Sequence, residues 1–125
     1  MKRRRFLLLF PAMAVAGCGK KQRLPAIPAG SSVLAFGDSV TFGTGAAPGE
    51  DWPTLLASMT GWNIRNAGLP GDTAAAGKAR LDSLLAEQVP ALVIITIGGN
   101  DFLRRRPANE VKEDIRQMIR SSRSA

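Results

Sequence analysis

The sequence predicts an α/β domain in which a parallel sheet is covered by helices on both faces, giving three layers. Strand and helix patterns alternate strictly along the chain, and each occurs three times. The predicted strands and helices are, in order, 32–36, 51–61, 62–68, 72–88, 91–99 and 108–122. Such alternation is typical of a parallel sheet, because each return to the same edge of the sheet needs a crossover helix.

The three predicted strands differ in hydropathy. SVLAF (32–36) is a short apolar run bounded by turn residues, and WNIRNAG (62–68) is more polar. ALVIITIGG (91–99) is apolar on both faces, which is typical of a central parallel strand. An exposed edge of this kind promotes aggregation, so we expect poor solubility or dependence on a partner if it lacks a neighbour.

Each predicted helix carries local signals. In DWPTLLASMTG (51–61), Asp51 is a plausible N-cap, Pro53 lies in the first turn and Gly61 stops the helix. An Asp-Thr pair opens 72–88, where Leu81, Leu84 and Leu85 have helical spacing. The helix at 108–122 has one apolar stripe, formed by Val111, Ile115, Met118 and Ile119.

The charge of the chain is unevenly distributed. The formal net charge is +7, and seven of the 17 lysines and arginines precede residue 24, where there is no acid. The ten that remain face ten acidic residues, so the domain is neutral and a nucleic-acid surface is not expected. Arg104, Arg105 and Arg106 form a short basic run that we interpret as a solvated loop.

The first 18 residues predict an export signal. A basic start precedes an apolar stretch that is too short to span a bilayer as a helix and is interrupted by Pro11. VAGC (15–18) resembles the lipobox of bacterial lipoproteins, which implies lipidation of Cys18. We therefore expect a tether over 19–31 and a membrane-anchored lipoprotein on the periplasmic face. Gly19 favours the outer membrane, and the alternative is a soluble secreted or periplasmic protein.

Polar, glycine-rich segments follow all three predicted strands. They read GDSV (37–40), NAGLPGDT (66–73) and GGND (98–101). Ligands of open parallel sheets bind beyond the carboxyl ends of the strands, so these segments are the candidate site. Asp38 and Asp101 adjoin the candidate residues directly, and we interpret them as structural hydrogen-bond acceptors rather than catalytic acids.

In order and spacing, these three segments resemble the first sequence blocks of the SGNH hydrolases, also called GDSL esterases or lipases. The resemblance covers about residues 32–106, includes DWPTLL, and is strongest to the bacterial thioesterase, lysophospholipase and arylesterase branch. It implies a flavodoxin-like α/β fold, with 32–125 as the N-terminal part of the domain, and no metal or cofactor. It also implies a small acyl ester, thioester or lysophospholipid as substrate.

Carried over by position, the resemblance implies that Ser39 is the nucleophile. The backbone N–H groups of Ser39 and Gly71 and the side-chain amide of Asn100 would form the oxyanion hole. Local sequence alone also allows structural roles. Ser39 could cap a helix or turn, Gly71 could be a turn glycine, and Asn100 could cap a turn through its side chain.

The family's last block, an Asp-x-x-His that supplies the catalytic base, has no counterpart, and the sequence contains no histidine. Two interpretations follow. The sequence is a truncated part of an ordinary esterase whose sheet is incomplete at its C-terminus, which we favour, or a non-catalytic lipoprotein that binds lipid or acyl groups. In either case we expect hydrolysis by this chain to be weak.

Overall fold

The computed structural model describes residues 25–125. It contains β1 (Ser32–Gly37), α1 (Ser39–Phe42), α2 (Trp52–Thr60), β2 (Asn63–Gly68), α3 (Ala74–Glu87), β3 (Leu92–Thr96), α4 (Gly99–Leu103) and α5 (Ala108–Ser124). The predicted export signal and Cys18 lie outside the described residues. All three predicted strands and all three predicted helices are present, with boundaries that shift by a few residues.

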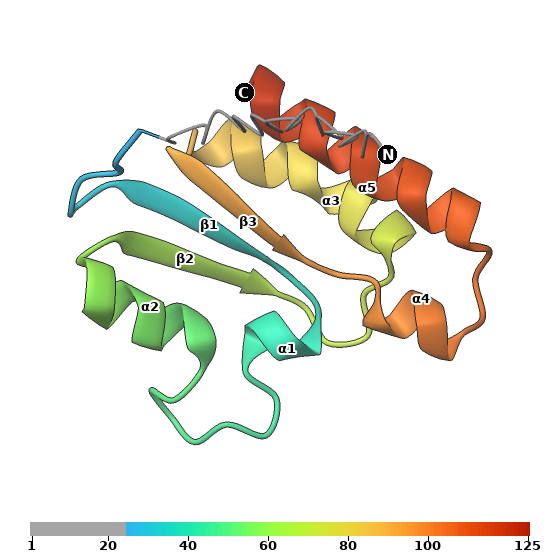
Figure 1. The fold of residues 1–125 in the computed structure, drawn as a ribbon, viewed down its shortest axis with the longest axis horizontal. Helices are drawn as coiled ribbons and strands as arrows, with labels where there is room; N and C mark the ends of the chain where they lie inside the picture. The colour runs from blue at the N-terminus through green and yellow to red at the C-terminus, as the bar shows by residue number, and fades with distance from the viewer. Residues whose placement is uncertain (1–24) are drawn as a thin grey trace, which may run out of the picture.

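The strands form one parallel sheet in the order β2-β1-β3. Leu34 and Phe36 of β1 contribute to the main apolar cluster, whereas the alternate residues Val33 and Ala35 are equally buried outside it. Both faces of β1 are therefore covered. α3 and α5 lie side by side along one side of the sheet, and α2 lies beside β2 on the other (Figure 1). The α/β prediction is confirmed.

Within the described residues the central strand is β1, and the most apolar predicted strand, β3, has a neighbour on one side only. β3 pairs only with β1 within 25–125, and its side chains are partly exposed. One face of this segment is still used, because Val93, Ile95 and Ile97 pack against the main cluster. The packing of this one face explains why Val93, Ile95 and Ile97 are apolar.

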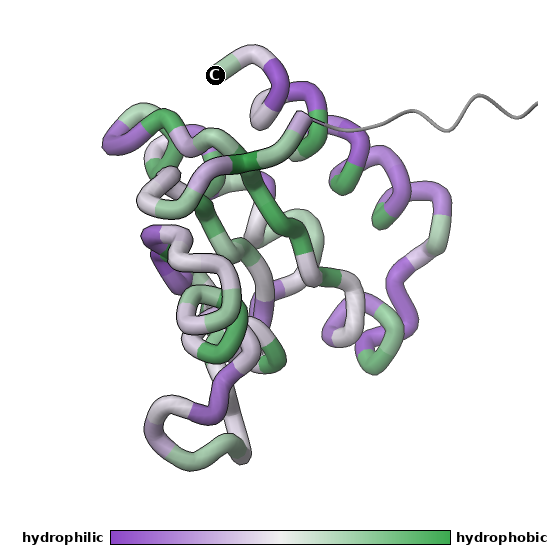
Figure 2. The backbone as a smooth tube through the Cα atoms, turned by 60° about the vertical axis from the view of Figure 1, so that its left-hand side comes forward, coloured by the Kyte–Doolittle hydropathy of each residue, from purple (hydrophilic) through white to green (hydrophobic). Residues whose placement is uncertain are grey.

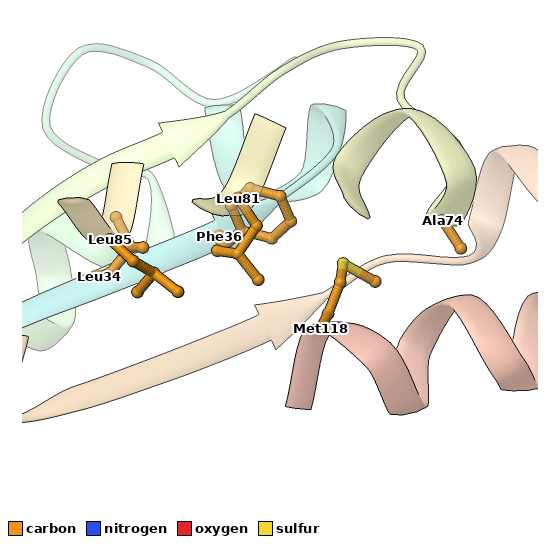
Figure 3. Packing of buried hydrophobic residues seen from close by; sticks show 6 residues of the cluster. All are labelled: Leu34, Phe36, Ala74, Leu81, Leu85 and Met118. Atoms are coloured by element: carbon orange, nitrogen blue, oxygen red, sulfur yellow. The ribbon is translucent and has the colours of Figure 1, made fainter. Parts of the chain in front are cut away.

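The core joins the sheet to α3 and α5. Phe36, Leu81 and Met118 are almost completely buried, with Leu34, Leu85 and Ala74 beside them (Figure 3). The amphipathic pattern of α5 is visible in Figure 2, where apolar and polar segments alternate along the helix. Ile119, predicted on the same stripe as Met118, is instead 40% exposed. None of the helices within residues 25–125 is long and apolar enough to cross a bilayer.

The residues predicted to begin and end α2 and to begin α3 have these roles in the structure. The Asp51 carboxylate accepts a hydrogen bond from the Thr54 N–H at 3.0 Å, and this bond lowers the pKa of Asp51. Gly61 ends α2 with a φ of 72°, a left-handed conformation that glycine adopts without strain. Thr73 caps α3 through the Ala76 N–H.

Candidate active site

The site begins where the sheet ends. Gly37 pairs with Gly68 on one side and with Thr96 on the other, so the three strands end level with one another. A Cβ on Gly37 would lie 2.2 Å from the Thr96 carbonyl oxygen and 2.3 Å from Thr41 Oγ1. Only glycine fits there. Because Gly37 has no side chain, Thr41 of α1 can pack directly against the end of β1.

Ser39 is the first residue of α1 and is half-buried. The preceding Asp38 caps this short helix, because its Oδ1 accepts a hydrogen bond from the Val40 N–H at 3.0 Å. The N–H groups in the first turn of a helix have no partner within the helix. The Ser39 N–H has no protein acceptor among residues 25–125 and can bind an external oxygen.

Asn100 lies in the first turn of α4, across the carboxyl end of the sheet from α1. Its Nδ2 donates to the backbone carbonyl of Asp72 at 2.9 Å. An amide nitrogen has two hydrogens, so this bond fixes the side chain and leaves one hydrogen for another acceptor.

The structure brings Ser39 and Asn100 to one cavity of about 340 Å³. Its other lining residues are Asp38, Val40, Gly99, Phe102 and Leu103. Phe102 and Leu103 are 82% and 76% exposed, so the cavity opens onto an apolar surface.

Gly71 does not line this cavity. It lies in the exposed turn before α3, with a φ of 87°, and its carbonyl accepts a hydrogen bond from Arg104 Nη2 at 3.1 Å. Its N–H, like that of Ser39, has no protein acceptor among the described residues. Asn100 connects this turn to the cavity, because it binds the carbonyl of the next residue, Asp72.

A larger cavity of about 500 Å³ lies between α4 and α5 and is lined mainly by apolar side chains such as Val111 and Ile115. It shares Phe102 with the smaller cavity but contains neither Ser39 nor Asn100. The smaller cavity is therefore the candidate site, since it holds both a hydroxyl and a free amide hydrogen.

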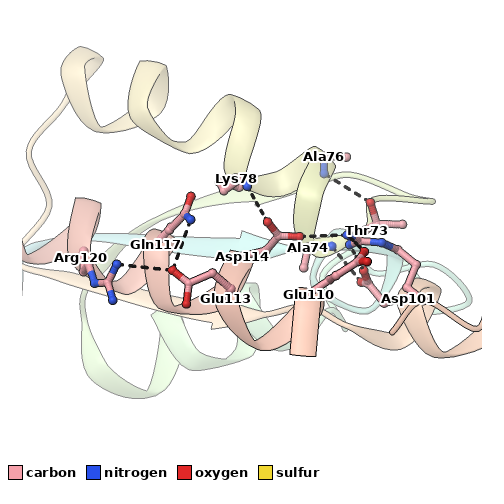
Figure 4. Close-up of polar contacts among 11 residues, drawn as sticks. Thr73, Ala74, Ala76, Lys78, Asp101, Glu110, Glu113, Asp114, Gln117 and Arg120 are labelled. Carbon is pink, nitrogen blue, oxygen red and sulfur yellow. Dashed lines mark hydrogen bonds and ion pairs between the residues drawn. The ribbon is translucent and has the colours of Figure 1, made fainter. Parts of the chain in front are cut away.

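Asp101 anchors the segment that carries Asn100. It is 1% exposed, and its Oδ2 accepts a hydrogen bond from the Ala74 N–H at 2.8 Å (Figure 4). Its Oδ1 accepts one from Arg106 Nη1 at 2.6 Å. Asp38 and Asp101 are thus structural acceptors, as the sequence indicated.

The basic run 104–106 is not simply a solvated loop. Arg106 is partly buried and also binds Asp114 of α5, at 3.1 Å from Nη2 to Oδ2. Its hydrogen bonds to Asp101 and then Asp114 raise the pKa of Arg106. Lys78 of α3 binds the other oxygen of Asp114, and this contact, together with Arg106, holds the pKa of Asp114 below its ordinary value (Figure 4). A charge network thus joins α3, α4 and α5.

Two residues near the site were not singled out from the sequence. Arg80 of α3 binds the ends of β1 and β2. The sequence feature that could have identified it is its position directly before Leu81, a residue of the predicted apolar face that the structure buries. Thr41 of α1 is fully buried, and nothing in the sequence marked it. No group of side chains within residues 25–125 is suited to hold a metal ion.

Comparison with known proteins identifies the family of the chain. The profile of the GDSL-like Lipase/Acylhydrolase family matches residues 35–125. Esterase TesA of Pseudomonas aeruginosa is 36% identical over 118 residues, which cover 90% of this chain and 59% of the relative. Thioesterase 1/protease 1/lysophospholipase L1 of Escherichia coli K12 is 32% identical over 99 residues, which cover 78% of this chain and 48% of that protein.

Solved structures agree. AlinE4, an SGNH-hydrolase family esterase, superposes with a TM-score of 0.73 at 33% identity, covering 79% of this chain and 56% of that one. The crystal structure of TesA gives a TM-score of 0.72 at 35% identity, covering 75% and 55%. The chain thus spans about half the length of the relatives it matches. The resemblance inferred from the three loops is confirmed, and the chain belongs to the GDSL-like lipase/acylhydrolase family of SGNH hydrolases.

Proposed function

We propose that this chain carries the nucleophile and oxyanion donors of a serine hydrolase that cleaves carboxylic esters or thioesters through an acyl-enzyme. One observation carries the proposal: the Ser39 hydroxyl and a free amide hydrogen of Asn100 belong to one cavity beyond the sheet's carboxyl end. The names of the relatives, esterase, thioesterase and arylesterase, support the same reaction class.

In the proposed reaction, Ser39 Oγ attacks the carbonyl carbon of the substrate and the carbonyl oxygen becomes an oxyanion. The Ser39 N–H, the second Asn100 Nδ2 hydrogen and the Gly71 N–H donate to it. The tetrahedral intermediate then collapses and the carbon–oxygen or carbon–sulfur bond breaks; the leaving group takes up the proton that Ser39 lost and departs as an alcohol or thiol, and the acyl group stays on Ser39. Water then attacks the acyl carbon and releases the acid.

The Ser39 proton needs an acceptor, and a histidine normally takes it. The sequence contains none. We therefore expect the isolated chain to react on the order of 10⁴-fold or more slowly than a complete relative.

The apolar mouth of the cavity favours an acyl substrate. Val40, Phe102 and Leu103 are all more than half exposed and line its rim. Small acyl esters or lysophospholipids fit this surface, because they combine an apolar chain with one polar carbonyl. The same rim supports the second candidate, a lipoprotein that binds acyl groups without cleaving them.

Chemical rescue tests the proposal. Added imidazole can act as a diffusible base in place of the histidine. We expect a fluorophosphonate to modify the wild-type chain slowly, imidazole to accelerate the reaction, and Ser39→Ala to abolish it. Peptide mass mapping identifies the modified residue. Ser31→Ala is the matched control, because Ser31 precedes β1 and lies outside the cavity.

The outcomes separate the two candidates. Modification of Ser39 that rises with imidazole supports the hydrolase. Fatty-acid binding that survives Ser39→Ala, with no adduct at any imidazole concentration, supports the binding lipoprotein. Ester hydrolysis at a normal family rate without imidazole would contradict the expected 10⁴-fold deficit.

We also propose that Cys18 is lipidated and holds the domain at the periplasmic face of the membrane. The support is the VAGC sequence, with the single cysteine of the chain at its end. Incorporation of an alkyne-labelled fatty acid in bacteria measures this directly. Equal labelling of the wild type and Cys18→Ser would rule the anchor out.

A further inference from the structure

Arg80 occupies an unusual place for a charged residue. It extends from α3 toward the carboxyl end of the sheet, and its side chain is only 24% exposed. The guanidinium lies over the ring of the buried Phe36, with Cζ 4.2 Å from the ring centroid. Stacking on an aromatic ring suits arginine, because its planar cation is weakly hydrated.

The guanidinium donates three hydrogen bonds to two strand ends and a loop. Nη2 binds the carbonyl oxygens of Gly37 at 3.0 Å and Ala67 at 2.9 Å. Nε binds Asp72 Oδ2 at 2.6 Å. Asp72 is 7% exposed, so its carboxylate depends on this partner for charge compensation.

These acceptors belong to the segments that carry the candidate site. Gly37 lies two residues before Ser39, and Asp72 directly follows Gly71. The backbone carbonyl of Asp72 also accepts the hydrogen bond from Asn100. Asp72 is therefore held on both sides, by Arg80 at its carboxylate and by Asn100 at its carbonyl. The Arg80 guanidinium therefore binds the end of β1 before Ser39 and the loop that contains Gly71. It is linked to the Asn100 segment through Asp72.

We propose that Arg80 is a positioning residue, which fixes the Ser39 and Gly71 loops relative to each other so that their N–H groups can act on one oxyanion. Its importance for catalysis rests on the proposed function, whereas its effect on the loops does not. The Gly37 carbonyl links the two loops most closely, because it accepts from both Arg80 and the Leu69 N–H, the latter at 2.9 Å.

Lysine cannot replace this arrangement. A single ammonium can neutralise Asp72, but it has no planar fork to reach the carboxylate and two carbonyls together. Arg80→Lys therefore keeps the charge and removes the geometry. Arg65→Lys is the matched control, because Arg65 pairs with Glu87 on the surface and is 41% exposed.

Amide hydrogen exchange measures the loops independently of catalysis. In Arg80→Lys we expect the Leu69 and Asp72 amides to exchange at least tenfold faster, because Leu69 donates to the Gly37 carbonyl and Asp72 donates to the Leu69 carbonyl, while amides of the central strand β1 keep their protection. Fluorophosphonate modification of Ser39 in imidazole should fall at least tenfold. Arg65→Lys should change neither measurement.

The results distinguish the two proposals. Uniformly faster exchange throughout the domain, unchanged exchange at Leu69 and Asp72, or wild-type modification of Ser39 in Arg80→Lys would each overturn positioning by Arg80. If the loops respond but even the wild-type Ser39 is never modified, the proposed function fails and the effect on the loops stands. Should Arg80→Lys not fold, Asp72→Asn decides, because it weakens one of the three contacts. In Asp72→Asn the Leu69 and Asp72 amides should also exchange faster, by a smaller factor than in Arg80→Lys. Unchanged exchange at these amides would refute the proposal.

Discussion

A single added methyl group at Gly68 tests how closely the site depends on packing between β2 and α1. Gly68 ends β2 opposite Gly37. A Cβ there would lie 2.1 Å from the Phe42 backbone nitrogen and 2.6 Å from Phe42 Cα. Real Cβ contacts stay beyond 3.0 Å, so α1 or β2 must move by at least about 0.9 Å, the difference between 3.0 and 2.1 Å.

The magnitude follows from what is displaced. Overpacking typically costs about 1–3 kcal/mol, and backbone atoms in a sheet and helix yield less readily than a side-chain tip. We therefore expect Gly68→Ala to lose about 3 kcal/mol of unfolding free energy, which corresponds to a melting temperature roughly 12–24 °C lower for a domain of this size. Since α1 begins at Ser39, modification of Ser39 in imidazole should fall about 100-fold.

Thermal unfolding followed by circular dichroism provides the assay, and Gly99→Ala provides the control. A Cβ on Gly99 would meet only Asp38 Oδ2, at an ordinary 3.5 Å. Gly99→Ala should melt within a few degrees of the wild type. If Gly68→Ala melts as close to the wild type as the control does, the glycine is not required for packing and the reasoning is wrong.

Two further predictions concern stability. Thr41 Oγ1 is fully buried and has no partner within residues 25–125, so Thr41→Val should leave the urea midpoint unchanged or raise stability by about 1 kcal/mol; a clear loss would indicate an uncounted hydrogen bond. The hydrogen bond from Lys78 chiefly lowers the pKa of Asp114 below its ordinary 3.8. The ionised Asp114 carboxylate therefore stabilises the folded state fully above about pH 4, and this stabilisation is lost as the pH falls through the lowered pKa. Asp114→Asn should flatten the dependence of the urea midpoint on pH below pH 4, and parallel profiles would contradict this.

Local signals explain why most of the fold was predictable. Asp51, Pro53 and Gly61 mark the ends of α2 within a few residues, and such end signals need no knowledge of the rest of the chain. The short helices α1 and α4 were not predicted, because four or five residues cannot establish a helical period. They are nevertheless the elements that position Ser39 and Asn100.

Strand order and the partners of the buried arginines could not be predicted in this way, because they depend on residues that are distant in the sequence. Hydropathy indicated that 91–99 is apolar on both faces, but strand order depends on crossovers that hydropathy does not encode. Arg106 resembled a solvated charge because it lies in a loop, and its buried partners Asp101 and Asp114 lie on two different helices, α4 and α5. The carbonyl partners of Arg80 lie 13 and 43 residues away along the chain.

The acids of the three loops show one common physical principle. Asp38, Asp72 and Asp101 are all buried and all adjoin a residue of the candidate site. A free carboxylate near a developing oxyanion would repel it. Asp38 instead accepts from a helix N–H, while Asp72 and Asp101 each bind an arginine. The carboxylates of these loops therefore hold the scaffold, and in the proposed reaction the Ser39 N–H and the second Asn100 Nδ2 hydrogen would stabilise the charge that forms on the substrate.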